Sequence, residues 1–220
     1  MSEYLFIKLL HLIGFAYWLG GDLGVFCSSF AVTNEKLSAE ARVTAAKILF
    51  VVDQGPRIAM TMMLPLGTHL AWRMGVLPIS DLAMAGVWIV SAGWLANVIY
   101  LHRAEPGMIK TRLMSFDFGF RAVVSGGLIA VGTLALMAEN PMIPYWVAAK
   151  FLIFGALVAC RLVIRIKLKP FMPAFASLAA GNASADDNLT IRNSLGGTRP
   201  VVVSIWIGLL ASAAFGLHLF

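Results

Sequence analysis

The chain has little charge and very little cysteine. Only 13% of its 220 residues are charged, whereas a soluble domain usually carries about 25%. The low charge and the 60% hydrophobic content exclude an ordinary soluble domain and predict an integral membrane protein. The two cysteines, Cys27 and Cys160, lie in apolar segments without a CxxC spacing, which argues against a disulfide framework or a cysteine zinc site. The net charge of +6 does not indicate nucleic-acid binding, because the basic residues flank apolar segments.

Long apolar segments predict an all-α, polytopic transmembrane helical bundle that forms a single integral membrane domain over 1–220. A membrane-spanning helix needs about 20 mainly apolar residues. About six spans meet this requirement, at 4–31, 57–77, 81–102, 119–138, 143–166 and 201–219. The polar stretch 168–200 predicts a mobile cytoplasmic loop. The short lead before the first span predicts that no signal peptide is cleaved.

One further helix is expected between the first two spans. Apolar residues recur at helical spacing over 38–52, and this pattern predicts a helix that lies at the membrane interface or continues the first span into the cytoplasm. Arg42 and Lys47 lie off its apolar stripe, so we expect both to face away from the packed side.

The basic residues indicate the orientation of the chain. They gather in or beside the loops between spans one and two, three and four, and five and six. Apart from Lys8 and Lys150 inside the spans, only Arg73 lies on the other side. Lysine and arginine are enriched in cytoplasmic loops. We therefore expect a multi-pass protein of the bacterial cytoplasmic (inner) membrane with both termini on the outer, periplasmic side.

Three ionisable side chains, His11, His69 and Lys150, fall inside the apolar spans. Such groups are costly in hydrocarbon and usually have a function. At a rise of 1.5 Å per residue, each lies about 10 Å below the outer edge of its span. Two histidines at one depth predict the axial ligands of a haem b iron. Lys150 is the alternative partner for His11, and His218, on the same side near the surface, is a substitute for His69.

Neighbouring residues fit a haem pocket. Lys8 and Trp18 share one helix face with His11, and Arg73 lies one turn outward of His69. We expect Lys8 and Arg73 to bind the haem propionates and Trp18 to contribute to cofactor binding. Asp22, on the same face at the inner end, is expected to pair with Arg57 or another basic residue.

These residues also carry a family resemblance. Lys8-Leu9-Leu10-His11, followed by Trp18-Leu19-Gly20-Gly21, resembles the first helix of the HemJ-type protoporphyrinogen oxidases and the related CopD-like integral membrane proteins. Trp146 followed by Lys150 is similar to a later helix of that superfamily. The resemblance implies a membrane protein that binds haem b, in which His11 is an iron ligand and Lys150 is required for catalysis. The second histidine that follows the first helix in HemJ-type proteins is absent here.

Three hypotheses of function follow. The first is a haem b membrane protein with one-electron redox chemistry, either a HemJ-like or quinone-linked oxidoreductase or a cytochrome-type electron-transfer subunit with a periplasmic redox partner. The second is a CopD-like copper or solute permease without haem, in which His11, Met62, His69 and His218 line a pathway and polar groups occur at every depth. The third is a structural membrane subunit of a larger complex. All three require the lipid bilayer and leave homo- or hetero-oligomerisation open, and none involves nucleic acid.

Overall fold

The computed structural model describes residues 3–219, which form helices joined by turns and short loops. The helices in chain order are α1 Glu3–Thr33, α2 Ala39–Val52, α3 Gln54–Arg73, α4 Asp81–Arg103, α5 Met108–Met137, α6 Tyr145–Lys167, α7 Phe171–Ala179 and α8 Ala185–Gly216. The predicted all-α class is therefore confirmed over the described residues.

Five helices in this range, α1, α4, α5, α6 and α8, are long and apolar enough to cross a membrane. The chain is thus a helical bundle of the multi-pass membrane type. The remaining predicted span, 57–77, corresponds to α3, which is not among these five. The number of six spans stays a prediction.

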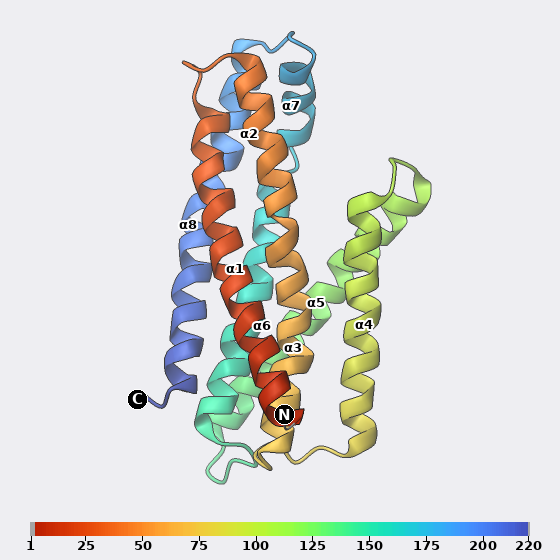
Figure 1. The fold of residues 1–220 in the computed structure, drawn as a ribbon, viewed down its shortest axis with the longest axis vertical. Helices are drawn as coiled ribbons and strands as arrows, with labels where there is room; N and C mark the ends of the chain where they lie inside the picture. The colour runs from red at the N-terminus through yellow and green to blue at the C-terminus, as the bar shows by residue number, and fades with distance from the viewer. Residues whose placement is uncertain (1–2, 220) are drawn as a thin grey trace.

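The two ends of the described chain lie at the same end of the bundle, which we call the terminal end (Figure 1). The opposite end, which we call the basic end, holds the second half of α1, all of α2 and α7, and the first half of α8. A separate hydrophobic core joins these segments, with Val32, Leu49, Phe171 and Ile191 among its buried members. The bundle therefore extends at the basic end beyond the helices α4 and α5.

The expectation of a mobile loop over 168–200 is wrong. This stretch forms α7 and the first half of α8. The side chain of Ser184 accepts a hydrogen bond from the Asp187 backbone N–H at 3.0 Å, and the Asp187 carboxylate accepts one from the Ser184 backbone N–H at 2.9 Å. This capping box satisfies N–H groups that a helix start leaves without partners. The polar residues therefore begin a helix, which buries Ile191 and Leu195 in the core at the basic end.

Helix α2 matches the helix predicted over 38–52, but Arg42 does not face away from the packed side. Its side chain is buried, and its Nε donates to the carbonyl oxygen of Val32 at 2.9 Å. Another guanidinium nitrogen donates to Asn188 Oδ1 at 2.8 Å. Val32 lies in the last turn of α1, where helix carbonyls have no partner within the helix. Arg42 therefore caps α1 and links it to α8.

Helices α5 and α6 approach each other closely because glycines face the partner helix. A Cβ atom at Gly132 of α5 would lie 2.6 Å from the Leu152 backbone nitrogen and 2.7 Å from the Ala148 carbonyl oxygen. At Gly155 of α6 it would lie 2.9 Å from the Ser125 carbonyl oxygen. The Ser125 hydroxyl donates to the Gly155 carbonyl oxygen at 2.7 Å. Small residues at such crossings let helices associate in a membrane by van der Waals contact.

The substitution Gly132→Ala tests this crossing. Its methyl group would overlap the backbone of α6, so we expect a loss of roughly 1–3 kcal/mol in the free energy of unfolding. Gly127→Ala on the same helix is the matched control, because a Cβ there meets no atom within 4 Å. Thermal unfolding of the two variants in detergent gives the comparison. Equal midpoints for both variants would contradict the proposed close contact.

Candidate functional site

His11 lies on α1 with one ring nitrogen unsatisfied. Its Nδ1 atom is buried and has no hydrogen-bond partner. The ring packs on α3 where that helix carries Gly67, and a Cβ at this position would lie 3.1 Å from His11 Cε1. A buried polar nitrogen without a partner is costly and rare in native proteins. His11 therefore has a buried ring nitrogen that is available to a metal ion.

Lys150 lies on α6, in the second turn of that helix. Its ammonium nitrogen lies 5.3 Å from the centroid of the Trp146 ring, and no ion pair with a carboxylate is found for it among residues 3–219. A Cβ at Gly216 of α8 would lie 2.7 Å from that nitrogen. The ring of His218 lies 5.3 Å from the Trp146 ring, edge to face. Helices α6 and α8 thus bring Lys150, Trp146 and His218 together.

His69, by contrast, has both ring nitrogens in hydrogen bonds. Its Nε2 lies 3.1 Å from a carboxylate oxygen of Glu3, and its Nδ1 accepts from the indole N–H of Trp88 at 3.2 Å. The accepting role of Nδ1 places the ring proton on Nε2. Binding of iron by His69 would therefore require one of these hydrogen bonds to break.

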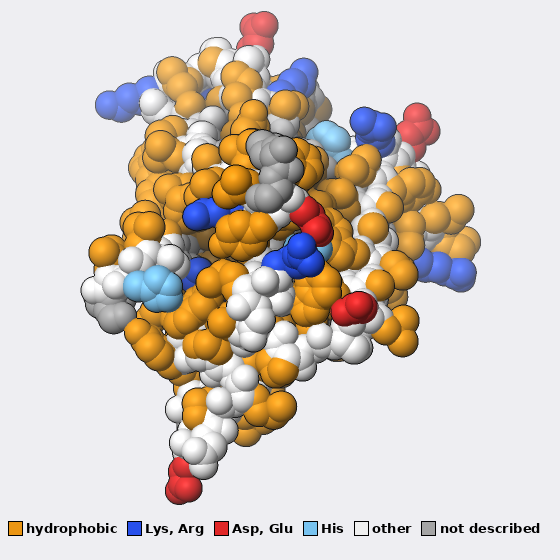
Figure 2. All heavy atoms as spheres, turned by 60° about the horizontal axis from the view of Figure 1, so that its bottom comes forward, with side chains coloured by type: hydrophobic (Ala, Val, Ile, Leu, Met, Phe, Trp, Pro, Cys, Tyr) orange, Lys and Arg blue, Asp and Glu red, His pale blue; other side chains and the backbone are white. Residues whose placement is uncertain are grey.

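Arg73 belongs to the same group as His69. It forms an ion pair with Glu3 at 3.3 Å and lies over the Trp72 ring at 5.6 Å. Figure 2, which brings the terminal end forward, shows acidic, basic and histidine side chains close together within a hydrophobic surface. Glu3 thus competes with any haem propionate for Arg73.

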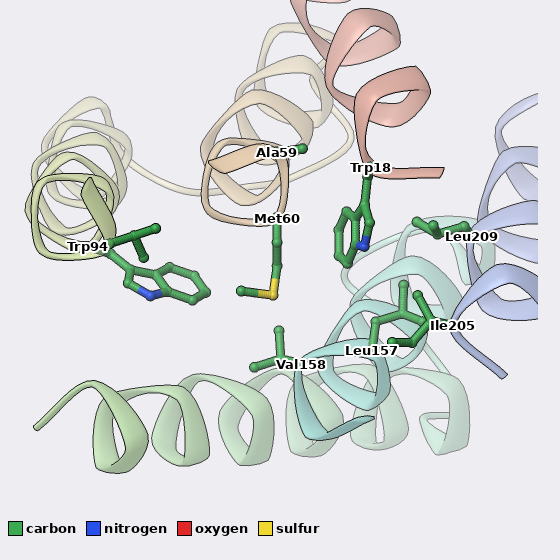
Figure 3. Close-up of a cluster of buried hydrophobic side chains, with 9 residues drawn as sticks. Trp18, Ala59, Met60, Trp94, Leu157, Val158, Ile205 and Leu209 are labelled. Atoms are coloured by element: carbon green, nitrogen blue, oxygen red, sulfur yellow. The ribbon is translucent and has the colours of Figure 1, made fainter. Parts of the chain in front are cut away.

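Lys8 and Trp18 lie in different surroundings. Lys8 is exposed on α1, whereas Trp18 is fully buried in the central core, where its ring packs edge to face on Phe154 at 5.9 Å. Figure 3 shows Trp18 and Trp94 on opposite sides of the Met60 side chain. Met60 is fully buried in this hydrophobic cluster. The structure therefore places Trp18 in the packing of the bundle, about two turns from His11 along α1.

A layer of buried ion pairs crosses the bundle near its basic end. Arg161 of α6 donates to Asp22 of α1 at 2.5 Å and to Asp53, between α2 and α3, at 3.2 Å. Asp53 also pairs with Arg57. Asp22 therefore has a basic partner, as expected, but this partner is Arg161, and Arg57 pairs with Asp53. One guanidinium group thus links three segments of the chain.

A second part of this layer joins α5 to α6. The carboxylate of Asp117, which is 3% exposed, accepts hydrogen bonds from Arg121 at 2.9 Å and from Arg165 at 2.8 Å. Arg121 also lies over the Trp94 ring at 5.4 Å. Arg121, Arg161 and Arg165 are among the basic residues that flank the predicted spans, and their pairing was not predicted. Asp22 and Asp117 within apolar helices were the available signal, because a buried carboxylate requires a basic partner.

No group of three or more histidine, cysteine or acidic side chains that could bind a metal ion occurs within residues 3–219. Comparison with protein-family models, with curated proteins and with solved structures gave no match.

The ion-pair layer predicts acid sensitivity. Burial raises the pKa of Asp53, but Arg57 and Arg161 outweigh this effect and hold that pKa below its ordinary value. Asp53 therefore contributes its full stabilisation at pH values above the ordinary pKa of an aspartate. This contribution disappears as the pH falls through the lowered pKa of Asp53 in the folded protein. We expect the unfolding midpoint of the wild type to fall with acidification, and that of Asp53→Asn to start lower and change less. Asp186→Asn, at an exposed carboxylate, is the control that should follow the wild type. If the unfolding midpoints of Asp53→Asn and the wild type fell in parallel with pH, the acid sensitivity would not come from Asp53.

Proposed function

We propose that the protein is a haem b membrane protein with one-electron redox chemistry, located in the bacterial cytoplasmic membrane with both termini outside. It would act as a HemJ-like or quinone-linked oxidoreductase, or as a cytochrome-type electron-transfer subunit with a periplasmic partner. The observation that carries this proposal is the buried Nδ1 of His11, which has no hydrogen-bond partner. An imidazole nitrogen is a preferred ligand for haem iron, and iron would satisfy this atom.

The surroundings of His11 fit a ligand set of His11 and Lys150. Glycine at positions 67 and 216 leaves the backbones of α3 and α8 without side chains beside His11 and Lys150. Lys150 has an aromatic neighbour in Trp146 but no carboxylate ion pair within the described residues. His69 has both nitrogens occupied. We therefore assign Lys150, rather than His69, as the second ligand, and His218 as the residue nearest to replace it.

Held by His11 and Lys150, a haem would supply single-electron transfer rather than oxygen binding. The protein's contribution would be to hold His11 and Lys150 in place and to exclude water. His11 packs against α3, and Lys150 packs against Trp146 and α8. Deprotonation of the Lys150 amine is needed before it can donate an electron pair.

Visible absorption of the purified protein tests the proposal. We expect a Soret band in the oxidised protein and sharp α and β bands after reduction with dithionite. His11→Ala should abolish these bands because it removes the iron ligand. His102→Ala, an exposed histidine at the other end of the bundle, should retain them.

A featureless spectrum from folded wild-type protein would rule out the haem assignment. Haem bound equally by the wild type and His11→Ala would rule out His11 as a ligand. Circular dichroism of each variant establishes that the helices are intact.

The second ligand is tested with Lys150→Met and His69→Ala. If Lys150 binds iron, its loss should give a five-coordinate, high-spin spectrum that responds to carbon monoxide, while His69→Ala should stay low-spin. A high-spin spectrum in His69→Ala and a low-spin spectrum in Lys150→Met would assign the second ligand to His69. A low-spin spectrum in both variants would direct the assignment to His218.

A copper or solute permease without haem is the second candidate, favoured by one observation. Buried polar side chains occur along the full length of the bundle, with His69 near the terminal end, Thr61 in the middle and Asp22 near the basic end. This proposal predicts a colourless protein that mediates uptake of Cu(I) into proteoliposomes, with uptake reduced in Met62→Leu. A coloured protein that shows no uptake would exclude it.

A further inference from the structure

An apolar groove of about 510 Å³ lies between α1 and the junction of α2 with α3. Tyr17, Gly20 and Gly21 line it from α1, and Val51, Val52 and Gly55 line it from the other side. No charged side chain lines the groove. Its walls are therefore suited to a hydrocarbon chain.

The groove results from the distribution of glycines. A Cβ at Gly21 would lie 2.5 Å from Pro56 Cδ, so the helices touch at this position. A Cβ at Gly20 or at Gly55 would meet no atom within 4 Å. The groove is thus an open space beside a tight helix contact. It exists because Gly20 and Gly55 have no side chains, although the packing leaves room for them.

The groove lies at a depth where lipid chains are present. Gly20 is about 25 Å from Glu3 along α1 at 1.5 Å per residue. The hydrocarbon core of a bilayer is about 30 Å thick, and headgroups extend the total to about 40–45 Å. The predicted first span begins beside Glu3, so we expect the groove to lie beside the acyl chains of the leaflet at the basic end.

A positive charge follows the groove on the headgroup side. Lys47, Val51 and Gly55 are spaced by four residues, so they lie along one side of the rod that α2 and α3 form. Asp53, between the two helices, has helical backbone angles, with φ −61° and ψ −17°. Lys47 is exposed and lies about 6 Å beyond Val51 along the helix. Glu40, the acidic residue of α2, lies about 10 Å farther from the groove than Lys47.

We propose that this groove binds one anionic phospholipid, with an acyl chain between α1 and the α2–α3 junction and the headgroup phosphate beside Lys47. An exposed lysine beside the headgroup favours a lipid of net negative charge over a zwitterionic lipid, whose cationic group it repels, and van der Waals contact with the glycine backbone holds the chain. This inference does not depend on the proposed haem function.

Native mass spectrometry of the detergent-purified protein with added lipid tests the proposal. Phosphatidylglycerol and phosphatidylcholine with identical acyl chains are the probes. We expect the wild type to retain one phosphatidylglycerol severalfold more than phosphatidylcholine. The double variant Gly20→Leu, Gly55→Leu should lose this preference because its side chains fill the groove. The matched control is Gly86→Leu, Gly93→Leu on α4, where a Cβ also meets no atom within 4 Å.

The substitution Lys47→Gln tests recognition of the headgroup separately from binding of the acyl chain. This variant should bind the two lipids equally, at the level at which the wild type binds phosphatidylcholine. Unchanged phosphatidylglycerol retention in the double leucine variant would overturn the groove as the site, and unchanged preference in Lys47→Gln would overturn the role of the lysine. Retention of an isoprenoid quinone in place of phospholipid would also overturn the proposal. Equal unfolding midpoints for all variants establish that the fold is intact.

Discussion

The arrangement of the bundle depends on Arg161 and the two carboxylates that it joins. Asp22, Asp53 and Arg161 are all buried or nearly so, and a charge removed from water is tolerated only when it is paired. This requirement fixes α1, the start of α3 and α6 at one level, because any axial slip would leave a charge without its partner. Asp117 with Arg165 imposes the same condition on α5 and α6. The ion pairs thus determine register, which apolar packing alone specifies weakly in a membrane.

The candidate site is a consequence of that register. Helices α1 and α6 run in the same direction from the terminal end, and His11 precedes Asp22 by the same number of residues as Lys150 precedes Arg161. Pairing Asp22 with Arg161 therefore brings His11 and Lys150 to the same depth. The glycine contacts of α3 and α8 then bring two further helices to this position. A histidine and a lysine, each costly in hydrocarbon, are set at one depth by charges about 16 Å away along the helices.

Sequence patterns predicted the helices well where hydrophobicity is continuous, as in α1, α4 and α6. They failed over 168–200, because polar residues at a helix start resemble those of a loop until the capping partner of Ser184 is known. They also placed Arg42 on the exposed side, because the unpaired carbonyl of Val32 that it caps belongs to another helix. The depth of His69 was inferred from its position along a span. Its engagement by Glu3 and Trp88 depends on two other helices.

The amino-acid sequence by itself determined the membrane class, the helical content and the identity of the costly ionisable groups, because each follows from local composition and periodicity. Only the tertiary structure decided which of those groups remain without partners. His11 and His69 look equivalent along the chain, yet His69 is satisfied on both nitrogens and His11 has a buried nitrogen without a partner. The physical reason is that hydrogen bonds and ion pairs between helices depend on the facing and register of segments far apart in the sequence.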